Sequence, residues 1–311
     1  MSIDNQKTSL YLNKNLEVYK LKGNDREDLL QRISTNSIVN RERYDHRTTL
    51  LLNDKGKLVD MLQLGAFGEY DLVISKSYET AFQYIDKYTF TEDISFEKTE
   101  FVLFEVLLAE GETTLLDTQL SPAKVNVLEL NGTELYAFVE YSNHVRLAVP
   151  KALVSELEDL EELEFISEAA FEQWRINSFV GELGKEYTDQ FIPLEIGLID
   201  YISFTKGCYI GQEIIARLDT YKKVTKYLAQ LKTECYLEPD MDYVLKNDSG
   251  KKLGVLTSLS TLNQDGYFHL CVLHRSIAEE GTSINIESED GSFKTKGIVD
   301  DILKEKTYLP T

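Results

Sequence analysis

The stretch that decides which fold to expect is Lys206-Gly207-Cys208-Tyr209-Ile210-Gly211-Gln212-Glu213. Two glycines flank its cysteine, so the backbone there is free to turn sharply or to lie close to a ligand. Lys206 and the nearby Arg217 would favour the thiolate form of the Cys208 side chain, and a thiolate is nucleophilic and able to bind metals. Cys208 is therefore the candidate catalytic residue, although many free cysteines are simply small buried hydrophobes.

This stretch also begins a basic segment within an acidic chain. Residues 206–232 contain six basic and two acidic residues, a local balance of +4, whereas the whole chain carries a formal charge of −20. So acidic a protein lacks the positive charge that general nucleic-acid binding needs. The basic segment is instead a candidate binding surface for a small anion.

Cysteine and histidine usage gives no metal site. Cys235 and Cys271 lie far from Cys208 in strand-like sequence and are expected to be core residues. Three scattered cysteines exclude a disulfide framework and a CxxC zinc site, and they fit a reducing compartment. The four histidines are scattered too, and we expect them on the surface.

Hydrophobic periodicity predicts two α+β units followed by a β unit. In the first, strands are expected over 16–21, 48–52, 57–64 and 70–74, with helices over 25–33 and 81–88. In the second, strands are expected over 101–108, 123–130, 135–140 and 145–149, followed by a helix over 151–163. The acidic run over residues 155–168 is expected to form a solvated helix face. Short strands over 226–231, 253–259, 267–273 and 283–286 predict a small barrel or sandwich.

These patterns suggest domains over residues 1–100, 101–225 and 226–311, with the first two interleaved or sequential. The first residues include no apolar signal-peptide core, and no run approaches the ~18 apolar residues of a membrane span. We therefore expect a cytoplasmic monomer that does not associate with membranes.

The octapeptide around Cys208 resembles the signature of the YgfZ family of folate-binding proteins. That family is related to the T-protein (aminomethyltransferase) of the glycine cleavage system and is associated with iron–sulfur cluster maturation. Further resemblance covers residues 29–36, 49–57, 175–198, 254–258 and 278–282. It implies an α+β cloverleaf of three domains, two related α+β domains and a C-terminal small β-barrel, around a central cavity that binds tetrahydrofolate or a one-carbon derivative.

Two departures from the aminomethyltransferases matter. Their hairpin strand usually carries paired acids after a Gly-Gly turn, whereas this chain has Gly56-Lys57 and then Asp60-Met61, with one acid only. They also have a glutamate that holds the pterin ring where this chain has Asn177. An amide still forms hydrogen bonds but supplies no charge. Both departures argue against efficient aminomethyl transfer, so an enzymatic role is less favoured, and the sequence leaves open whether catalytic turnover occurs.

The leading hypothesis is a folate-binding accessory protein for iron–sulfur cluster assembly or repair, with Cys208 as the reactive or ligating thiol and iron–sulfur client or assembly proteins as partners. Lys206 and Arg217 would attract the folate glutamate tail, and Asp60, Asn177 and Glu195 would face the pterin. The structural alternatives are that Asp60 points to solvent from its strand and that Glu195 caps a helix.

Two other functions stay open. One is a tetrahydrofolate-dependent aminomethyltransferase in which Cys208 is incidental, and the other is an interaction module with a vestigial pocket. The family resemblance also brings an association with tRNA modification. The sequence leaves open whether that effect passes through iron–sulfur enzymes that modify tRNA.

Overall fold

The computed structural model describes residues 6–141, 143–261 and 265–303, in two compact units. Of these residues, the sheet unit comprises 6–141, 143–166 and 200–212, and the barrel unit comprises 167–199, 213–261 and 265–303. Residues 1–5, which carry part of the expectation that no signal peptide is present, lie outside the described residues.

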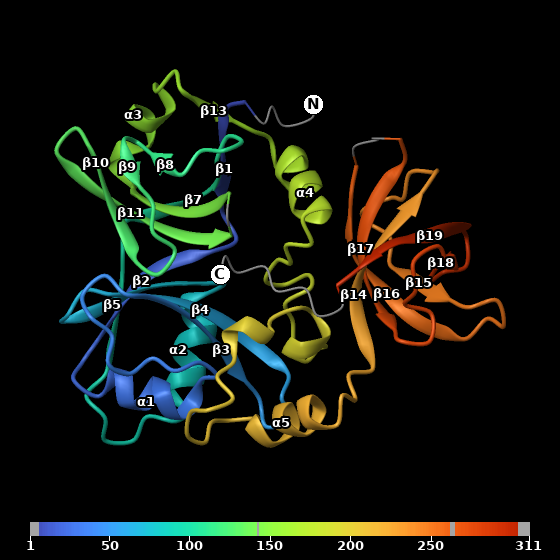
Figure 1. Ribbon diagram of the computed structural model, residues 1–311, viewed down its shortest axis with the longest axis horizontal. Helices are drawn as coiled ribbons and strands as arrows, with labels where there is room; N and C mark the ends of the chain where they lie inside the picture. The colour runs from blue at the N-terminus through green and yellow to red at the C-terminus, as the bar shows by residue number, and fades with distance from the viewer. Residues whose placement is uncertain (1–5, 142, 262–264, 304–311) are drawn as a thin grey trace. The chain divides into compact units, whose positions relative to one another are not determined.

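The first sheet of the sheet unit has five strands in the order β3-β4-β5-β2-β6 (Figure 1). Their bounds are His46–Leu52 (β3), Leu58–Ala66 (β4), Tyr70–Ser75 (β5), Glu17–Lys22 (β2) and Ser95–Lys98 (β6). Helices α1 (Arg26–Ile33) and α2 (Tyr78–Asp86) cover one face. Leu29 and Ile33 of α1 and Ile85 of α2 are buried there against Leu62 and Leu64 of β4, as their helical spacing predicts.

The second sheet has six strands in the order β10-β11-β12-β7-β1-β13. Their bounds are Val125–Leu130 (β10), Thr133–Tyr141 (β11), His144–Pro150 (β12), Phe101–Leu107 (β7), Thr8–Asn13 (β1) and Leu163–Phe165 (β13). Strands β8 (Thr114–Leu115) and β9 (Thr118–Gln119) pair with each other and form a separate two-stranded sheet. Strand β1 comes from the start of the chain but pairs with β7 and β13, so this sheet is assembled from distant segments.

The prediction of a helix over residues 151–163 is wrong, because the helix is much shorter. A 3-10 turn (Lys151–Leu153) leads into α3, which covers only Val154–Glu158. Leu163 pairs with Thr8 in a parallel bridge, so the segment must leave the helix to reach β1. The acids of this region are exposed or half-buried, as expected for a solvated surface.

An apolar layer joins the two sheets. Val18, Leu72 and Ile74 of the first sheet are buried together with Val125 and Phe138 of the second. Gly65 of β4 fits this layer because a Cβ at that position would lie 2.5 Å from Cγ2 of Val125. At this point the two sheets therefore lie closer together than a side chain at position 65 would allow.

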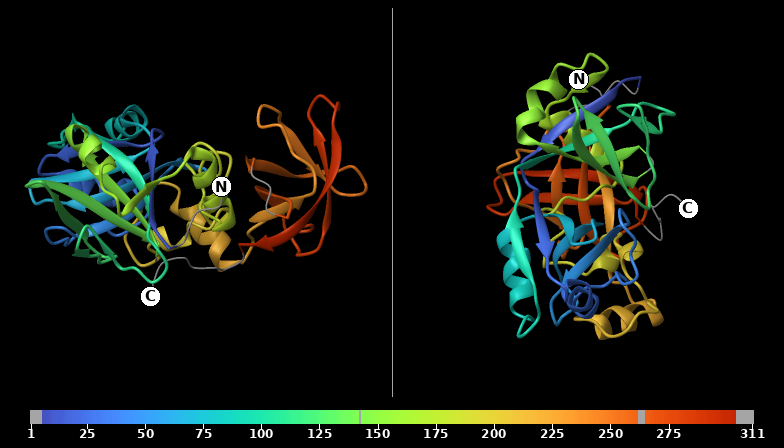
Figure 2. Two further views of the ribbon diagram at one scale, coloured as in Figure 1. Left: turned by 90° about the horizontal axis from the view of Figure 1, so that it is seen from above. Right: turned by 90° about the vertical axis from the view of Figure 1, so that its left-hand side faces the viewer.

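The barrel unit holds a closed six-stranded barrel in the order β14-β17-β16-β15-β18-β19 (Figure 2). Its strands are Lys226–Thr233 (β14), Tyr243–Lys246 (β15), Lys252–Leu259 (β16), Tyr267–His274 (β17), Ser283–Ser288 (β18) and Lys294–Ile302 (β19). The predicted α+β class and C-terminal barrel are confirmed. Closure leaves no free sheet edge, which explains how such short strands form a stable unit.

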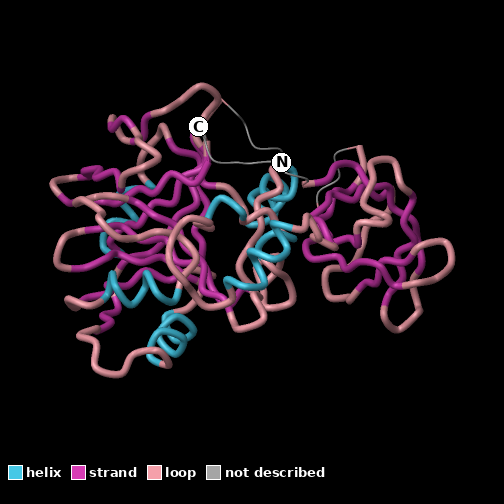
Figure 3. Tube along the Cα trace, turned by 60° about the horizontal axis from the view of Figure 1, so that its bottom comes forward, coloured by secondary structure: helices cyan, strands magenta, loops and turns pink. Residues whose placement is uncertain are grey.

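Few helices accompany these strands (Figure 3). The barrel unit adds α4 (Glu168–Asn177) and a 3-10 turn at Pro193–Glu195, a further 3-10 turn covers Ile199–Tyr201, and α5 (Gln212–Thr220) begins at the boundary between the units. None of the helices in the described part of the chain has the length and apolar content to cross a bilayer.

The expectation of surface histidines is wrong for three of the four. His46, His144 and His269 are buried. Each occupies the interior with a polar partner: His144 Nε2 lies 2.6 Å from Glu105 Oε2, and His269 Nε2 lies 2.9 Å from Thr233 Oγ1. Burial lowers the pKa of His46 and of His269 to about 4, so both rings are neutral near pH 7. Cys271 is buried, as predicted, and Cys235 is half-buried.

Candidate functional site

The Cys208 loop belongs to the sheet unit, between the 3-10 turn at Ile199–Tyr201 and α5. Cys208 is exposed. Gly211 has φ +81°, and a Cβ there would lie 2.8 Å from the carbonyl oxygen of Asn53, so this glycine lets the loop rest on the β3–β4 turn. A Cβ on Gly207 would meet nothing within 4 Å. Only the second glycine of the motif is therefore required by close packing.

Lys206 fixes the same loop to the segment that follows α1. Its ammonium donates to the carbonyl oxygens of Ser34 at 2.7 Å and Asn36 at 2.8 Å, and lies 5.6 Å from the ring centroid of Tyr209. Burial lowers the pKa of Lys206 to about 8. Both acceptors bonded to this ammonium are neutral carbonyl oxygens, so they do not offset the lowering of its pKa by burial as a carboxylate would. The lysine expected to attract a folate tail is thus engaged within the protein.

The segment after α1 is held from three sides. The Thr35 hydroxyl donates to the carbonyl oxygen of Tyr201 at 2.7 Å and accepts from the amide of Leu50 at 3.0 Å. The amide of Ser203 donates to the Thr35 carbonyl oxygen at 3.0 Å, and the Asn36 side-chain amide donates to the Thr48 carbonyl oxygen at 2.8 Å. Residues from α1, β3 and the Cys208 loop therefore form one connected scaffold.

A cavity of about 260 Å³ opens beside this scaffold, wholly within the sheet unit. Because Asn36 lines it and also accepts from Lys206, the cavity wall is bonded directly to the Cys208 loop. Its lining combines polar groups with a few apolar ones: Asn36, His46, Arg47, Thr48, Pro122, Ala123, Val139, Glu140, Asp200 and Tyr201.

A buried polar network lies behind Glu140. The Glu140 carboxylate accepts from the Gln63 side-chain amide and from Arg146 Nη1, the latter at 3.3 Å. Arg146 Nη1 also donates to Gln63 Oε1 at 2.8 Å, and Arg146 Nε donates to Glu105 Oε1 at 3.2 Å. Glu105 further accepts from the Asn13 amide at 2.7 Å. One arginine is therefore shared by two buried carboxylates, one of which lines the cavity.

The two carboxylates of this network have opposite pKa shifts. Burial raises the pKa of Glu105, but Arg146 and His144 outweigh it, and the net value is about 2. Burial also raises the pKa of Glu140, and there Arg146 offsets it only in part, so the pKa stays above its ordinary value. Glu105 is the firmly charged partner of Arg146, whereas Glu140 is the carboxyl that takes up a proton more readily.

Asp60 lies elsewhere in the sheet unit. Its side chain is fully buried, so the alternative of a solvent-facing strand residue is wrong. It shares a face of β4 with Leu62 and Leu64, which pack against α1 and α2, whereas Gln63 on the opposite face reaches the cavity network. Asp60 Oδ1 accepts from the amide of Met61 at 2.8 Å, but among the described residues Oδ2 has no hydrogen-bond partner.

The remaining predicted folate contacts lie in the barrel unit, or in the part of α5 that belongs to it. Asn177 is exposed at the end of α4 and accepts from the Gln173 amide at 2.9 Å. Glu195 is buried, accepts from the Ile192 amide and from the Thr225 hydroxyl, each at 3.2 Å, and so caps its own 3-10 turn. Arg217 is exposed and pairs with Glu213 at 2.6 Å along α5.

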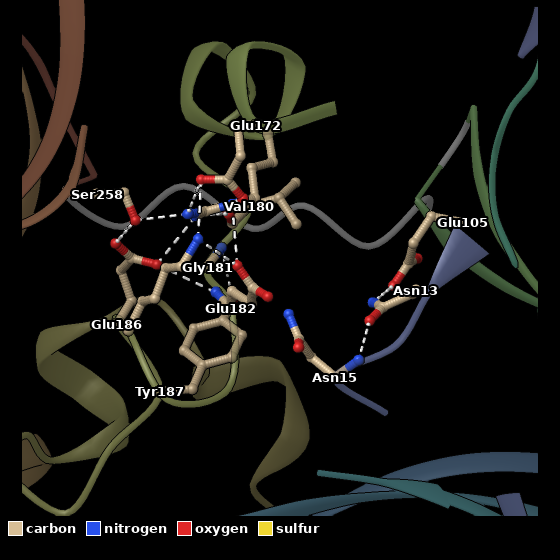
Figure 4. A network of polar contacts seen from close by, with 12 residues as sticks. Asn13, Asn15, Glu105, Glu172, Val180, Gly181, Glu182, Glu186, Tyr187 and Ser258 are labelled. Atoms are coloured by element: carbon tan, nitrogen blue, oxygen red, sulfur yellow. Dashed lines mark hydrogen bonds and ion pairs between the residues drawn. The ribbon is translucent and has the colours of Figure 1, made fainter. Parts of the chain in front are cut away.

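The segment that contains Asn177 is organised by Arg175. Its guanidinium is buried and bonds to Glu172 through Nε at 2.6 Å and Nη2 at 2.7 Å, to Glu186 through Nη1 at 3.1 Å and to the Ser258 hydroxyl at 2.5 Å. Figure 4 shows Glu172, Glu186 and Ser258 converging from α4, the following loop and the barrel. Arg175 therefore anchors α4 to strand β16 and is structural.

Sequence reasoning missed the residues that line the cavity. Glu140 offered a signal, since it interrupts an otherwise apolar strand run, Ala137 to Val139, at a position that the sheet buries. His46 and Thr48 offered none, because polar residues near the start of a strand commonly face solvent. The cavity depends on β3, β11 and the 3-10 turn at Ile199–Tyr201 meeting in space, and no local pattern encodes that meeting.

Sequence comparison finds relatives that align with part of this chain. No family model matches the chain. It is 36% identical over 134 residues to a chloroplastic protein of Arabidopsis thaliana whose name suggests a transferase, covering 43% of this chain and 29% of that protein. It is 29% identical over 199 residues to the tRNA-modifying protein YgfZ of Vibrio atlanticus, covering 63% of this chain and 60% of that protein.

A third relative, the tRNA-modifying protein YgfZ of Blochmanniella pennsylvanica, is 35% identical over 103 residues, 30% of this chain and 31% of that protein. The chain therefore spans less than two thirds of the length of each of these relatives. In structure it matches the glycine cleavage system aminomethyltransferase T of Bartonella henselae with a TM-score of 0.76 and 17% identity, over 98% of this chain and 88% of that one. The expected fold is confirmed, and so is the resemblance to YgfZ proteins.

Proposed function

We propose that this protein binds a reduced folate and serves as an accessory factor in iron–sulfur cluster assembly or repair, with Cys208 as the working thiol. The observation that carries the proposal is the bond from Lys206 to the Asn36 carbonyl oxygen, which joins the Cys208 loop to the wall of the Glu140 cavity. A ligand seated in that cavity would lie against the same scaffold that positions the thiol. The similarity to YgfZ proteins and to an aminomethyltransferase structure supports the folate-binding part of this proposal.

The cavity residues suit a pterin ring. Its volume of about 260 Å³ lies just below the usual range of about 300–1,000 Å³ for small-molecule sites, so it suits the ring of a folate and not its tail, and its walls supply both acceptors and donors. Each carboxylate oxygen of Glu140 has a second lone pair beyond the one used by Gln63 or Arg146, so it is able to accept from an amino group and a ring N–H. The neutral His46 ring avoids a buried charge beside the ligand.

The anionic tail of a folate needs a cation, and Arg47 at the cavity is better suited than Lys206. Arg47 is exposed and forms no ion pair with any other described residue, whereas both close contacts of the Lys206 ammonium are backbone carbonyls of its own unit. Contacts from Asp60, Asn177, Glu195 and Arg217 stay predictions. In particular, Asp60 would have to act from the far side of β4.

Cys208 would supply the chemistry. Its exposure leaves the sulfur open to a partner protein, and the Lys206 bonds and the Gly211 contact limit the movement of its loop. A thiolate is a natural ligand for iron that is being delivered to, or withdrawn from, a client protein. In this role iron is cargo, and the described residues contain no cluster of His, Cys, Asp and Glu suited to holding a metal.

The decisive experiment is replacement of Cys208 by Ser in cells that lack the chromosomal copy. We expect the activities of iron–sulfur enzymes to fall to the level of the deletion strain, while calorimetry with tetrahydrofolate gives an unchanged Kd. Cys235→Ser is the matched control, because that thiol is half-buried in the barrel unit and is not among the residues that line the cavity.

Full support of iron–sulfur enzymes by Cys208→Ser would contradict the proposed role of the thiol. Formation of methylene-tetrahydrofolate from an aminomethylated carrier would instead favour the transferase alternative. A cytoplasmic monomer, which the sequence predicts, is part of the proposal and is checked by cell fractionation and by light scattering.

A further inference from the structure

A second cavity lies wholly within the barrel unit, between the first turns of α4 and strands β15 and β16. Its volume is about 600 Å³, which lies within the usual range for small-molecule sites. The folate proposal uses none of its residues. The chemistry of its lining indicates what kind of ligand it would accept.

The cations at this cavity are already neutralised. Lys185 lines it, and its ammonium lies 2.9 Å from Glu172 Oε2 and 2.8 Å from Glu182 Oε2. Arg175, behind the lining, is buried and bonded to Glu172 and Glu186. An anionic ligand would therefore have to displace an existing ion pair.

Two carboxylates at the rim, in contrast, are not neutralised by any described cation. Glu168 and Asp242 line the cavity, are exposed, and form no ion pair with any other described residue. Together with Glu172 and Lys185 they give the lining a formal charge of −2. An incoming cation would gain two partners there without breaking a bond.

Apolar groups form the deeper wall. Tyr243 is buried, and Leu256 and Leu259 of β16 are half-buried at the cavity. The Tyr243 hydroxyl accepts from the amide of Glu238 at 2.9 Å, which fixes the ring in place. The cavity thus offers apolar surface to one end of a ligand and uncompensated carboxylates to the other.

We propose that this cavity binds a small organic cation, a protonated amine carried on an apolar or aromatic stem. The ammonium would sit between Glu168 and Asp242, and the stem would pack on Tyr243 and Leu256. We assign the cavity to a small molecule rather than to a lysine of a partner protein, because about 600 Å³ is more than one lysine side chain fills and is typical of small-molecule sites. Amine recognition here is independent of folate binding in the sheet unit.

The test is calorimetric titration of the full chain with three probes that share one ring. Tryptamine carries the ammonium, tryptophol replaces it with a neutral hydroxyl, and indole-3-acetate replaces it with an anion. We expect tryptamine to bind about tenfold more tightly than tryptophol, which corresponds to about 1.4 kcal/mol shared between two exposed ion pairs. Indole-3-acetate should bind most weakly, and added salt should weaken tryptamine alone.

The double variant Glu168→Gln/Asp242→Asn should lose about tenfold in tryptamine affinity and keep its affinity for tryptophol. Both side chains are exposed, so the fold should persist, and circular dichroism checks this. Glu234→Gln removes an exposed charge of the same unit away from the cavity and should change nothing. No heat from tryptamine at millimolar concentration, equal binding of amine and alcohol, or unchanged affinity in the double variant would each overturn the proposal.

Discussion

Replacement of Asp60 by Asn should make the stability of the protein less dependent on pH. Asp60 is fully buried, its Oδ2 atom has no hydrogen-bond partner among the described residues, and burial raises the pKa of its carboxyl to about 7. Two backbone amides, those of Met61 and Lys76, donate to Oδ1 and lower the pKa, but they do not offset burial. The folded state therefore prefers the neutral acid.

The sign and size follow from proton linkage. The carboxyl has a pKa of 3.8 as an isolated group and of about 7 when folded, so the unfolded chain releases its proton first as the pH rises. This costs the folded state about 1.4 kcal/mol per pH unit between those values, and the cost levels off above pH 7. Between pH 5 and pH 8 the contribution of Asp60 to the free energy of unfolding should fall by about 2.5 kcal/mol.

The assay is urea unfolding followed by far-ultraviolet circular dichroism at several pH values. At pH 5 the free energies of unfolding of Asp60→Asn and of the wild type should differ by no more than about 2 kcal/mol. At pH 8 the variant should be the more stable protein, and the difference in its favour should have grown by about 2.5 kcal/mol. Asp54→Asn, an exposed acid in the β3–β4 turn of the same unit, should leave the pH dependence unchanged. A constant difference between Asp60→Asn and the wild type would refute the reasoning.

Three further predictions concern the scaffold and the thiols. Arg146→Met leaves Glu105 and Glu140 buried without their shared cation and should lower the free energy of unfolding by about 3–5 kcal/mol in urea unfolding; a loss below about 1 kcal/mol would contradict the role of Arg146. Gly211→Ala should lower the free energy of unfolding by about 1–2 kcal/mol or more, because φ there is +81° and the new Cβ would meet the Asn53 carbonyl oxygen. Gly207→Ala should change it by no more than about 0.5 kcal/mol. Equal effects of the two substitutions would be inconsistent with the loop geometry. Maleimide labelling followed by mass spectrometry should modify exposed Cys208 first and buried Cys271, whose thiol pKa burial raises, only on unfolding; early labelling of Cys271 would argue against the described core.

Local signals in the sequence predicted much of the fold. Strands β3, β4 and β5 follow from the alternation and turns between residues 48 and 74, and the barrel follows from its short strands. Strands β1, β6, β8, β9, β13, β15 and β19 and helices α4 and α5 were not predicted, and two of them show why. Strand β19 carries charged residues at Lys294, Lys296 and Asp300 on its exposed side, so its sequence resembles a polar loop, and the three-residue β13 exists only because β1 lies beside it.

The site was harder to predict than the fold because its residues meet only through tertiary contacts. The motif identified Cys208 and Lys206, but the partners of Lys206 are backbone carbonyls of Ser34 and Asn36, about 170 residues away in sequence. Asp60 shows the same limit, since the β4 pattern does not reveal which face carries the helices. In a buried charge network such as that of Arg146, each strand contributes few charged residues to an otherwise apolar sequence. The network can be recognised only once the pairing of the strands is known.

The most direct test of the central claim, that a folate binds in the Glu140 cavity beside the Cys208 scaffold, is calorimetric titration of Ala123→Trp with tetrahydrofolate. Ala123 is exposed at the cavity, so an indole there should block the entrance without disturbing the core. Ala152→Trp places the same ring on an exposed position of the same unit outside the cavity. We expect Ala123→Trp to lose at least about tenfold in affinity, corresponding to about 1.4 kcal/mol, while Ala152→Trp binds like the wild type. Equal affinity in all three proteins would contradict the account.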